Sequence, residues 1–533
     1  MALSTDPAPG AAPGPGPSPR SGASALGAIV AAALAVAAAI GLGELVAALV
    51  SPASSPFLAV GQAAIRLTPE PVKQFAIATF GLYDKVALLG GMGLTIVLVV
   101  VVVGLASRHD HRPGLVLVVA FGLVAVAAVI SAPAFGPADL LAPLAALLVG
   151  VAVWSLLHRL ATAAGEAGGD AHTGSAGVPD GLARRRLLLT AGGVALGAGA
   201  AGIAGRALAS GGTSPSSVGP LPTAATAPPL PPAGADFVAS GTPTWITSNA
   251  DFYRIDTALS VPRISTTTWS LRIHGMVDRE ITLDYDALRS RRLVEAPITM
   301  SCVSNEIGGD LVSNAMFLGV PMRDLLAEAG VRPGAEQIAS TSADGWTANT
   351  PLGPLTDDRP AMLALGMNGA PLPVEHGFPV RMVVPGLYGY VSGCKWITDI
   401  EVTTFAAFTS YWEQRGWAEQ GPVKTQSRID VPRAGATVPA GATTVAGVAW
   451  APHTGIDGVE VSVDGGSWSP AELAVEPSAD SWRMWRLVTT LGPGAHQLRV
   501  RAKDRSGDVQ TPFVTPVIPD GASGWHTVQV TAV

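Results

Sequence analysis

Long apolar runs in the N-terminal 210 residues constrain the fold of this chain more than any other feature. Five runs rich in Ala, Val, Leu and Ile cover residues 26–50, 86–106, 114–130, 140–157 and 187–208. Each is near the roughly 20 residues that a helix needs to cross a bilayer, although the third and fourth are short. Charged residues make up only 14% of the chain, against about 25% in an ordinary soluble domain. We therefore predict a bundle of about five transmembrane helices, and we exclude a purely soluble enzyme.

Basic residues between the runs indicate their orientation. Clusters at 108–112 and 184–186 follow the second and the fourth run. Cytoplasmic loops carry an excess of Lys and Arg, so both clusters are placed inside the cell, which puts everything after residue 208 outside. The connection 51–85 carries basic residues on the outer side, and we expect its part 71–83 to lie along the membrane interface as an amphipathic helix.

The arginines at 184–186 have two interpretations. Consecutive arginines before a weakly hydrophobic Gly/Ala-rich segment resemble a twin-arginine export signal. An ordinary positive-inside anchor explains the same charges equally well. Proteins exported by the twin-arginine route leave the cytoplasm already folded, often with a cofactor inserted, so the domain that follows favours the first interpretation.

Composition divides the chain into five parts. Residues 1–24 are rich in Pro, Gly and Ala and predict a disordered tail, which the transmembrane region follows at 25–209. Residues 210–235 have the Ser, Thr, Ala and Pro content of a linker. The last two parts, 236–420 and 421–533, have the aromatic and charged residues of globular domains.

The part at 236–420 mixes strand and helix patterns, which predicts an α/β domain. Its expected elements are strands at 269–273, 380–384 and 395–402 and a helix at 322–329.

The part at 421–533 shows short alternating runs separated by turn residues, which favours an immunoglobulin-like β-sandwich. The expected strands are 445–450, 458–463, 483–489, 497–502 and 525–530. Asp464-Gly465-Gly466 predicts a hairpin turn, because both glycines accept positive φ.

Cys302 is the first candidate for chemistry, because it stands where an apolar strand runs into a polar, Gly-ended turn. A thiolate is a soft ligand for a transition metal, although an isolated cysteine is also a common core residue. The only other cysteine is Cys394. Two cysteines are too few for a disulfide scaffold or a cysteine-rich metal site, and the sequence leaves open a single bridge or a single special thiolate.

A second group of residues lies between 367 and 396. His376, Arg381 and Lys395, with tight turns and small residues around them, predict a pocket for a phosphorylated organic cofactor. The net charge is −7, from 33 basic and 40 acidic residues, and no basic block is large enough for nucleic-acid binding.

These motifs resemble one family. The segment MNGAPLPVEHGFPVRMVVPG, the CKW motif and the Cys302 turn are similar in order and spacing to those of the sulfite oxidase family of molybdenum enzymes. The resemblance covers about 249–533. It implies a mixed α/β molybdopterin-binding domain at 236–420, followed by an immunoglobulin-like domain, often used for dimerisation, at 421–533; the apolar runs are additional.

The resemblance also implies roles for individual residues. Cys302 would bind molybdenum, Arg254 would bind substrate, and Trp346 stands at the position of the family's active-site tyrosine. The implied cofactor-binding residues are Asn249, Phe252, Tyr253, His376, Arg381, Ser392, Gly393 and Lys395.

Departures from the family pattern concern the substrate. Asn305-Glu306-Ile307 replaces an Asn-Arg-Arg run, Asp256 replaces a histidine, and a further arginine is missing near Pro519-Asp520-Gly521. A dianion such as sulfite needs compensating positive charge in a partly desolvated pocket. We therefore expect a neutral or cationic substrate, such as a sulfoxide or an N-oxide.

The predicted function is two-electron oxygen-atom transfer by a membrane-anchored molybdenum–molybdopterin oxidoreductase outside the cytoplasmic membrane. The sequence shows no haem or iron–sulfur ligand set, so electrons would pass to or from a quinone bound by the membrane half or a separate cytochrome. Membrane lipid and a second copy of the chain are the other expected partners. The alternatives are a cofactor-free binding or assembly protein that keeps the fold, and a transporter, although Glu44 is the one mid-depth charge in the spans.

Overall fold

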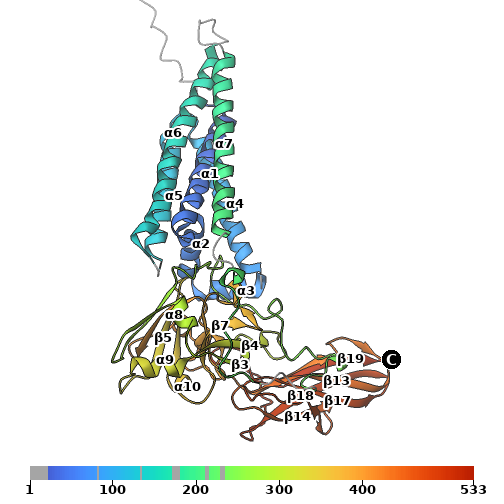
Figure 1. Ribbon diagram of the computed structural model, residues 1–533. Helices are drawn as coiled ribbons and strands as arrows, with labels where there is room; N and C mark the ends of the chain where they lie inside the picture. Colours follow the sequence, from blue (N-terminus) through green and yellow to red (C-terminus); the bar gives the residue numbers. More distant parts are fainter. Residues whose placement is uncertain (1–21, 81–82, 133–134, 171–179, 211–214, 229–233) are drawn as a thin grey trace, which may run out of the picture. The chain divides into compact units, whose positions relative to one another are not determined.

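The computed structural model describes residues 22–80, 83–132, 135–170, 180–210, 215–228 and 234–533 (Figure 1). It divides into two compact units, Met1–Ala209 and Ser210–Val533. The predicted tail at 1–24 lies almost entirely outside the described residues. The two units are described separately.

The first unit is helical. Its helices are α1 (Ala25–Val50), α2 (Pro56–Leu67), α3 (Glu70–Phe80), α4 (Asp84–Ala106), α5 (Arg112–Ile130), α6 (Leu141–Asp170) and α7 (Asp180–Ser210). Five of them (α1, α4, α5, α6 and α7) are long and apolar enough to cross a membrane, by length and composition. Each matches one of the predicted runs. Helix α3 lies where an interfacial helix was expected, whereas α2 in the same connection was not predicted.

Small residues let the helices of this unit approach closely. Ala31 and Ala35 of α1 are buried in the core of the bundle. Trp154 of α6 is fully buried, and its indole N–H donates to the carbonyl of His111, 3.1 Å away. The Glu44 carboxylate accepts a hydrogen bond from the Ser55 hydroxyl.

The second unit begins with an α/β part, as predicted. One sheet has the order β2-β1-β10-β5-β6, and another has the order β3-β4-β7-β8 with β9 paired to β7. The strands are β1 (Ser270–Gly275), β2 (Ile281–Asp284), β3 (Val294–Ser301), β4 (Val312–Pro321), β5 (Gln337–Ser342), β6 (Thr347–Pro351), β7 (Met362–Met367), β8 (Ala370–Pro371), β9 (Arg381–Val383) and β10 (Ile397–Thr403). The helices are α8 (Tyr285–Arg289), α9 (Met322–Ala329), α10 (Gly353–Thr356) and α11 (Gly389–Ser392).

Sequence patterns located these elements well. The predicted strands coincide with β1, β9 and β10 to within about two residues, the usual uncertainty of strand ends, and the predicted helix coincides with α9. Apolar side chains of both sheets, such as Ile273, Val320 and Ile400, are fully buried in one core.

The C-terminal part is β-rich and has two sheets. Their orders are β11-β13-β17-β16 and β12-β19-β18-β14-β15. The strands are β11 (Gln426–Val431), β12 (Thr437–Val438), β13 (Gly441–Trp450), β14 (Ile456–Val463), β15 (Ser469–Pro470), β16 (Glu472–Leu473), β17 (Arg483–Leu491), β18 (Gly494–Asp504) and β19 (His526–Ala532). Val445, Trp485, Val500 and Val528 come from both sheets and share one buried core.

The five predicted strands of this part are confirmed as β13, β14, β17, β18 and β19. The turn after β14 differs in one detail. Asp464 and Gly465 take positive φ, at 53° and 73°, whereas Gly466 does not. The positive φ angles of the turn therefore fall on the Asp-Gly pair, and a Cβ at Gly466 would lie 3.1 Å from the Val463 carbonyl oxygen.

Two side chains of the C-terminal part hold the turn that follows β3. The Arg428 guanidinium donates to the carbonyl of Gly309, 2.8 Å away. Gly308 has a φ of +76°, and a Cβ there would lie 2.3 Å from the His526 ring, so only glycine fits beneath this histidine. The position of this turn thus depends on residues far along the chain.

We predict that His526 makes the second unit acid-sensitive. Its Nδ1 accepts the Ile429 N–H, 3.0 Å away, and burial together with Arg428 lowers the pKa of His526 to about 4. An unfolded histidine titrates near pH 6.5, so the unfolded chain binds more protons, and stability is lost as pH falls from about 6.5 toward 4. In His526→Gln the free energy of unfolding that is lost between pH 7 and pH 5 should be smaller by about 1–2 kcal/mol. The measurement is the melting temperature as a function of pH.

His496→Gln is the matched control. Asp464 raises the pKa of His496, so this histidine contributes stability at low pH that is lost as pH rises. Its replacement should therefore steepen the loss of stability on acidification. An unchanged pH profile in His526→Gln would contradict the prediction.

Candidate active site

Cys302 directly follows β3 and begins the turn to β4. The turn is closed by two hydrogen bonds: the Cys302 N–H donates to the Leu311 carbonyl, and the Leu311 N–H donates to Asn305 Oδ1, both over 2.9 Å. The thiol is buried, and burial raises the pKa of Cys302. Cys302 and Cys394 are both free, so the bridge left open by the sequence is not formed.

A pocket opens beside Cys302; the space in it that protein atoms leave empty is about 870 Å³, with the open solvent at its mouth included. Its lining comes from five stretches of chain that lie far apart in the sequence. They are 252–257, 300–304, 342–346, 376–396 and 412–417, which contribute, among others, Tyr253, Asp256, Met300, Asp344, Tyr390, Trp396, Trp412 and Trp417.

Arg381 of β9 brings a buried positive charge to this cavity. Its side chain donates to the His376 carbonyl (3.2 Å) and to the Met300 sulfur (3.4 Å). Among the described residues its Nε has no hydrogen-bond partner, and no carboxylate pairs with it. Burial lowers the pKa of Arg381 only to about 10, so the group stays charged at neutral pH. A buried cation in this state is a binding site for an anion.

His376 lies between the aromatic residues and Arg381. Its ring meets the Phe252 ring edge-on, with centroids 5.5 Å apart, and its Nε2 lies 2.9 Å from the Asn249 carbonyl. Burial and the charge of Arg381 lower the pKa of His376 to about 4. The imidazole is therefore neutral at pH 7, and its Nε2–H donates to Asn249.

Lys395 and Arg254 share one carboxylate. Lys395 Nζ lies 3.0 Å from Asp256 Oδ2, and Arg254 Nε lies 2.8 Å from the same oxygen. The Asp256 side chain is only 4% exposed, whereas that of Arg254 is 43% exposed. Burial lowers the pKa of Lys395 to about 8, and Asp256 opposes this shift.

Most of the residues predicted from the sequence meet at the cavity. Those that line it are Cys302, Trp346, Phe252, Tyr253, His376, Arg381, Gly393 and Lys395. Three do not line it: Arg254 points to Asp256, Asn249 binds Asn368, and the Ser392 hydroxyl donates to the Leu387 and Tyr388 carbonyls. Glu306 is exposed and also does not line the cavity.

An aromatic wall, formed by Trp346, Tyr390, Trp412 and Trp417, was only partly foreseen. The Trp417 ring lies 6.0 Å from the Tyr390 ring and 6.2 Å from the Trp412 ring, between centroids. Only Trp346 was predicted as a site residue. The density of aromatic residues at 411–417, in the segment that follows β10, is the signal that would have indicated Trp412 and Trp417; Tyr390 had no such signal.

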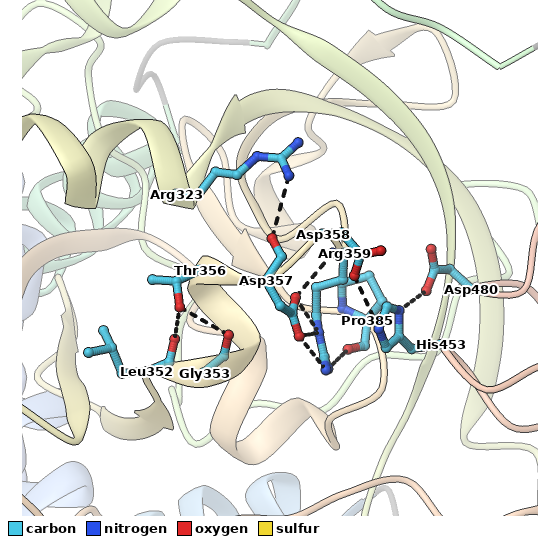
Figure 2. A network of polar contacts seen from close by, with 10 residues as sticks. All are labelled: Arg323, Leu352, Gly353, Thr356, Asp357, Asp358, Arg359, Pro385, His453 and Asp480. Carbon is cyan, nitrogen blue, oxygen red and sulfur yellow. Dashed lines mark hydrogen bonds and ion pairs between the residues drawn. The ribbon is translucent and has the colours of Figure 1, made fainter. Parts of the chain in front are cut away.

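A separate cluster of Asp357, Asp358 and His453 has ligand atoms within 4.8 Å of one another. Figure 2 shows why it is an ion-pair network: the Arg359 guanidinium is turned onto the Asp357 carboxylate, with distances of 2.8–3.0 Å. His453 lies 3.2 Å from Asp480 and 3.9 Å from Asp358. The cluster thus joins the α/β and β-rich parts.

The second unit is similar in sequence to known proteins. The family model for the oxidoreductase molybdopterin binding domain matches residues 258–412. Human mitochondrial sulfite oxidase is 29% identical over 346 residues, which cover 54% of this chain and 62% of that protein. Chicken sulfite oxidase is 30% identical, covering 49% of this chain and 67% of the relative. The uncharacterized oxidoreductase YuiH of Bacillus subtilis (strain 168) is 32% identical, covering 29% of this chain and 75% of the relative.

The fold and the matched domain define an oxidoreductase that binds molybdopterin. More narrowly, the chain belongs to the sulfite oxidase family of molybdopterin-dependent oxidoreductases. The lining of the cavity fits this cofactor. The buried Arg381 Nε lacks a hydrogen-bond partner and could donate to an anionic group, and the Cys302 thiol is a soft metal donor.

We predict that Arg381 is needed to retain the cofactor. Arg381→Gln removes the buried charge, so the molybdenum content per purified chain should fall roughly tenfold or more. Arg381→Lys keeps the charge without the planar guanidinium and should restore part of it. Elemental analysis measures the molybdenum, and the melting temperature of each variant checks that it is folded.

Arg359→Gln is the matched control, because Arg359 pairs with Asp357 away from the cavity. Its molybdenum content should stay near that of the unmodified chain. Full molybdenum in Arg381→Gln would refute the role of this cation.

Proposed function

We propose that this chain is a membrane-anchored molybdenum–molybdopterin oxidoreductase that transfers an oxygen atom to or from a small neutral or cationic substrate outside the cytoplasmic membrane. One observation carries the proposal: the Cys302 thiol and the unpaired Arg381 guanidinium line the same cavity. A soft metal ligand and an anion-binding cation are the two features that such a cofactor requires.

Individual roles follow from the contacts. Cys302 would bind the metal, which requires loss of its proton. Arg381 would meet the cofactor phosphate, and His376 and Lys395 would meet the edges of the pterin ring, with Phe252 and Tyr253 packed beside them. Asn249, Ser392 and Gly393 would fix the backbone around it. When bound, the cofactor supplies a metal that exchanges an oxygen atom and two electrons with the substrate.

The charged and aromatic residues that line the cavity support a substrate other than sulfite. Its charged lining residues besides Cys302 balance, with Asp256 and Asp344 against Arg381 and Lys395. The aromatic wall is a surface of ring systems, which suits apolar groups and cations better than anions. A sulfoxide or an N-oxide suits this lining better than a dianion does. Trp346, which lines the cavity, is the proposed substrate contact; Arg254, predicted from the sequence for the same role, is bound to Asp256 and does not line the cavity.

The membrane part of the proposal is supported by five apolar helices of sufficient length. In the proposed topology they span the membrane with the N-terminus inside, and the arginines at 184–186 act as an export signal or as an anchor. Electrons pass to or from a quinone in the helical unit or a cytochrome. The domain boundaries 236–420 and 421–533 are supported by the gap between β10 and β11, and an immunoglobulin-like dimer interface at 421–533 completes the proposal.

Molybdenum analysis tests the proposal directly. We expect about one molybdenum per chain, since Cys302 supplies a single thiolate, with the metal lost or spectroscopically altered in Cys302→Ala. Cys394→Ala is the matched control, because Cys394 is buried but does not line the cavity. An unmodified chain without molybdenum, from a host that makes the cofactor, would favour the cofactor-free alternative.

The aromatic wall gives a second test. Trp412→Ala should raise the KM for dimethyl sulfoxide or trimethylamine N-oxide roughly tenfold, with reduced methyl viologen as electron donor and molybdenum content unchanged. Trp468→Ala, which removes a tryptophan that packs on Trp525 and does not line the cavity, should leave the KM unchanged. Failure of the unmodified chain to reduce either compound would contradict the proposed substrate class.

A further inference from the structure

Asp256 is the best-enclosed acidic group of the cavity. Its side chain is 4% exposed, and a single oxygen, Oδ2, receives both Arg254 Nε at 2.8 Å and Lys395 Nζ at 3.0 Å. A carboxylate that bridges two cations in this way occupies the position that a bound oxyanion would take. The protein therefore supplies its own anion to two of the cations around the cavity.

We propose that Asp256 is the specificity-determining residue that excludes small oxyanions, such as sulfite and sulfate, from the substrate site. This inference rests on the proposed function and names the residue that sets its substrate class. Asp256 acts through Arg254 and Lys395, and it is a positioning residue with no direct role in the chemistry.

The surroundings of Lys395 show what the carboxylate does. Apart from Asp256, Lys395 Nζ donates to the Glu375 carbonyl at 3.3 Å and lies 4.6 Å from the Trp396 ring centroid. Neither neighbour carries a formal charge, so Asp256 is the group that neutralises this ammonium. Without it, an exchangeable anion would be drawn to the same place.

The remaining charges of the cavity do not replace this function. Arg381 has contacts other than Asp256: its guanidinium contacts Met300 and the His376 carbonyl and lies 5.8 Å from the Phe317 ring centroid. Asp344 is the other lining carboxylate, and its Oδ1 accepts the Trp346 N–H. Asp344 thus adds negative charge without bridging the two cations.

The experiment compares sulfate binding by the purified full-length protein and its variants, followed as the rise in melting temperature with sulfate concentration. Chloride at equal ionic strength corrects for general salt effects. Asp256→Asn keeps the shape and releases both cations, so its affinity for sulfate should exceed that of the unmodified protein roughly tenfold or more, and the gain should weaken with salt.

Two variants control for charge and for folding. Asp344→Asn removes one negative charge from the same cavity without releasing a cation, and should gain no comparable sulfate affinity. Asp256→Glu keeps the carboxylate and should bind sulfate as weakly as the unmodified protein. Molybdenum content is measured for every variant.

Several outcomes would overturn the inference. Equal sulfate affinity in Asp256→Asn and the unmodified protein removes its basis, and an equal gain in Asp344→Asn would show that net charge alone is responsible. Loss of molybdenum in Asp256→Asn, without any gain in sulfate binding, would assign Asp256 to cofactor retention. Absence of molybdenum from the unmodified protein would instead refute the proposed function itself.

Discussion

The buried guanidinium of Arg381 is the interaction on which the rest of the cavity depends. A full positive charge at 5% exposure costs free energy unless an anion or several hydrogen bonds meet it. Among the described residues the protein offers it a carbonyl oxygen, a sulfur and the ring of Phe317, and no carboxylate. The same charge helps to keep His376 neutral, which fixes the hydrogen bond from that ring to Asn249. In a chain without an anionic cofactor, burial of this charge would destabilise the fold and nothing would offset it. The arrangement therefore favours the enzyme over the cofactor-free alternative.

The β-rich part contributes to the site although none of its residues lines the cavity. Arg428 and His526 hold the turn after Cys302, and the N–H of Trp482 donates to the Thr299 hydroxyl of β3 over 2.7 Å. Both contacts act on the strand and turn that carry the thiol. Truncation of the C-terminal part would therefore change the position of Cys302 as well as expose apolar surface.

Sequence patterns predicted what depends on neighbouring residues along the chain. The apolar runs gave the five long helices, and alternation gave the strands of the β-rich part, because a period of 3.6 or 2 is a local property. Helix α2 was missed because its apolar stretch is short and follows a proline. Cys302, His376 and Arg381 were found through their motifs, whereas Trp412, Trp417 and the pairing of Asp256 with Lys395 were not. The pairing joins residues 139 positions apart, so nothing local marks it, whereas Trp412 and Trp417 lie in an aromatic-rich stretch of sequence that was not used.

The cations of the cavity region divide into two kinds, and this division explains how one site can bind an anionic cofactor and yet disfavour an anionic substrate. Arg381 is almost completely buried and lacks a carboxylate, so its charge is available to a group that stays bound. Lys395 and Arg254 share one carboxylate of the same chain, Asp256, which removes one of their two positive charges. A substrate that enters from water therefore meets aromatic rings and balanced lining charge. Removing water from a dianion costs several kcal/mol, and cations that are already paired with a carboxylate do not offset this. The arrangement therefore selects for substrates that carry no negative charge.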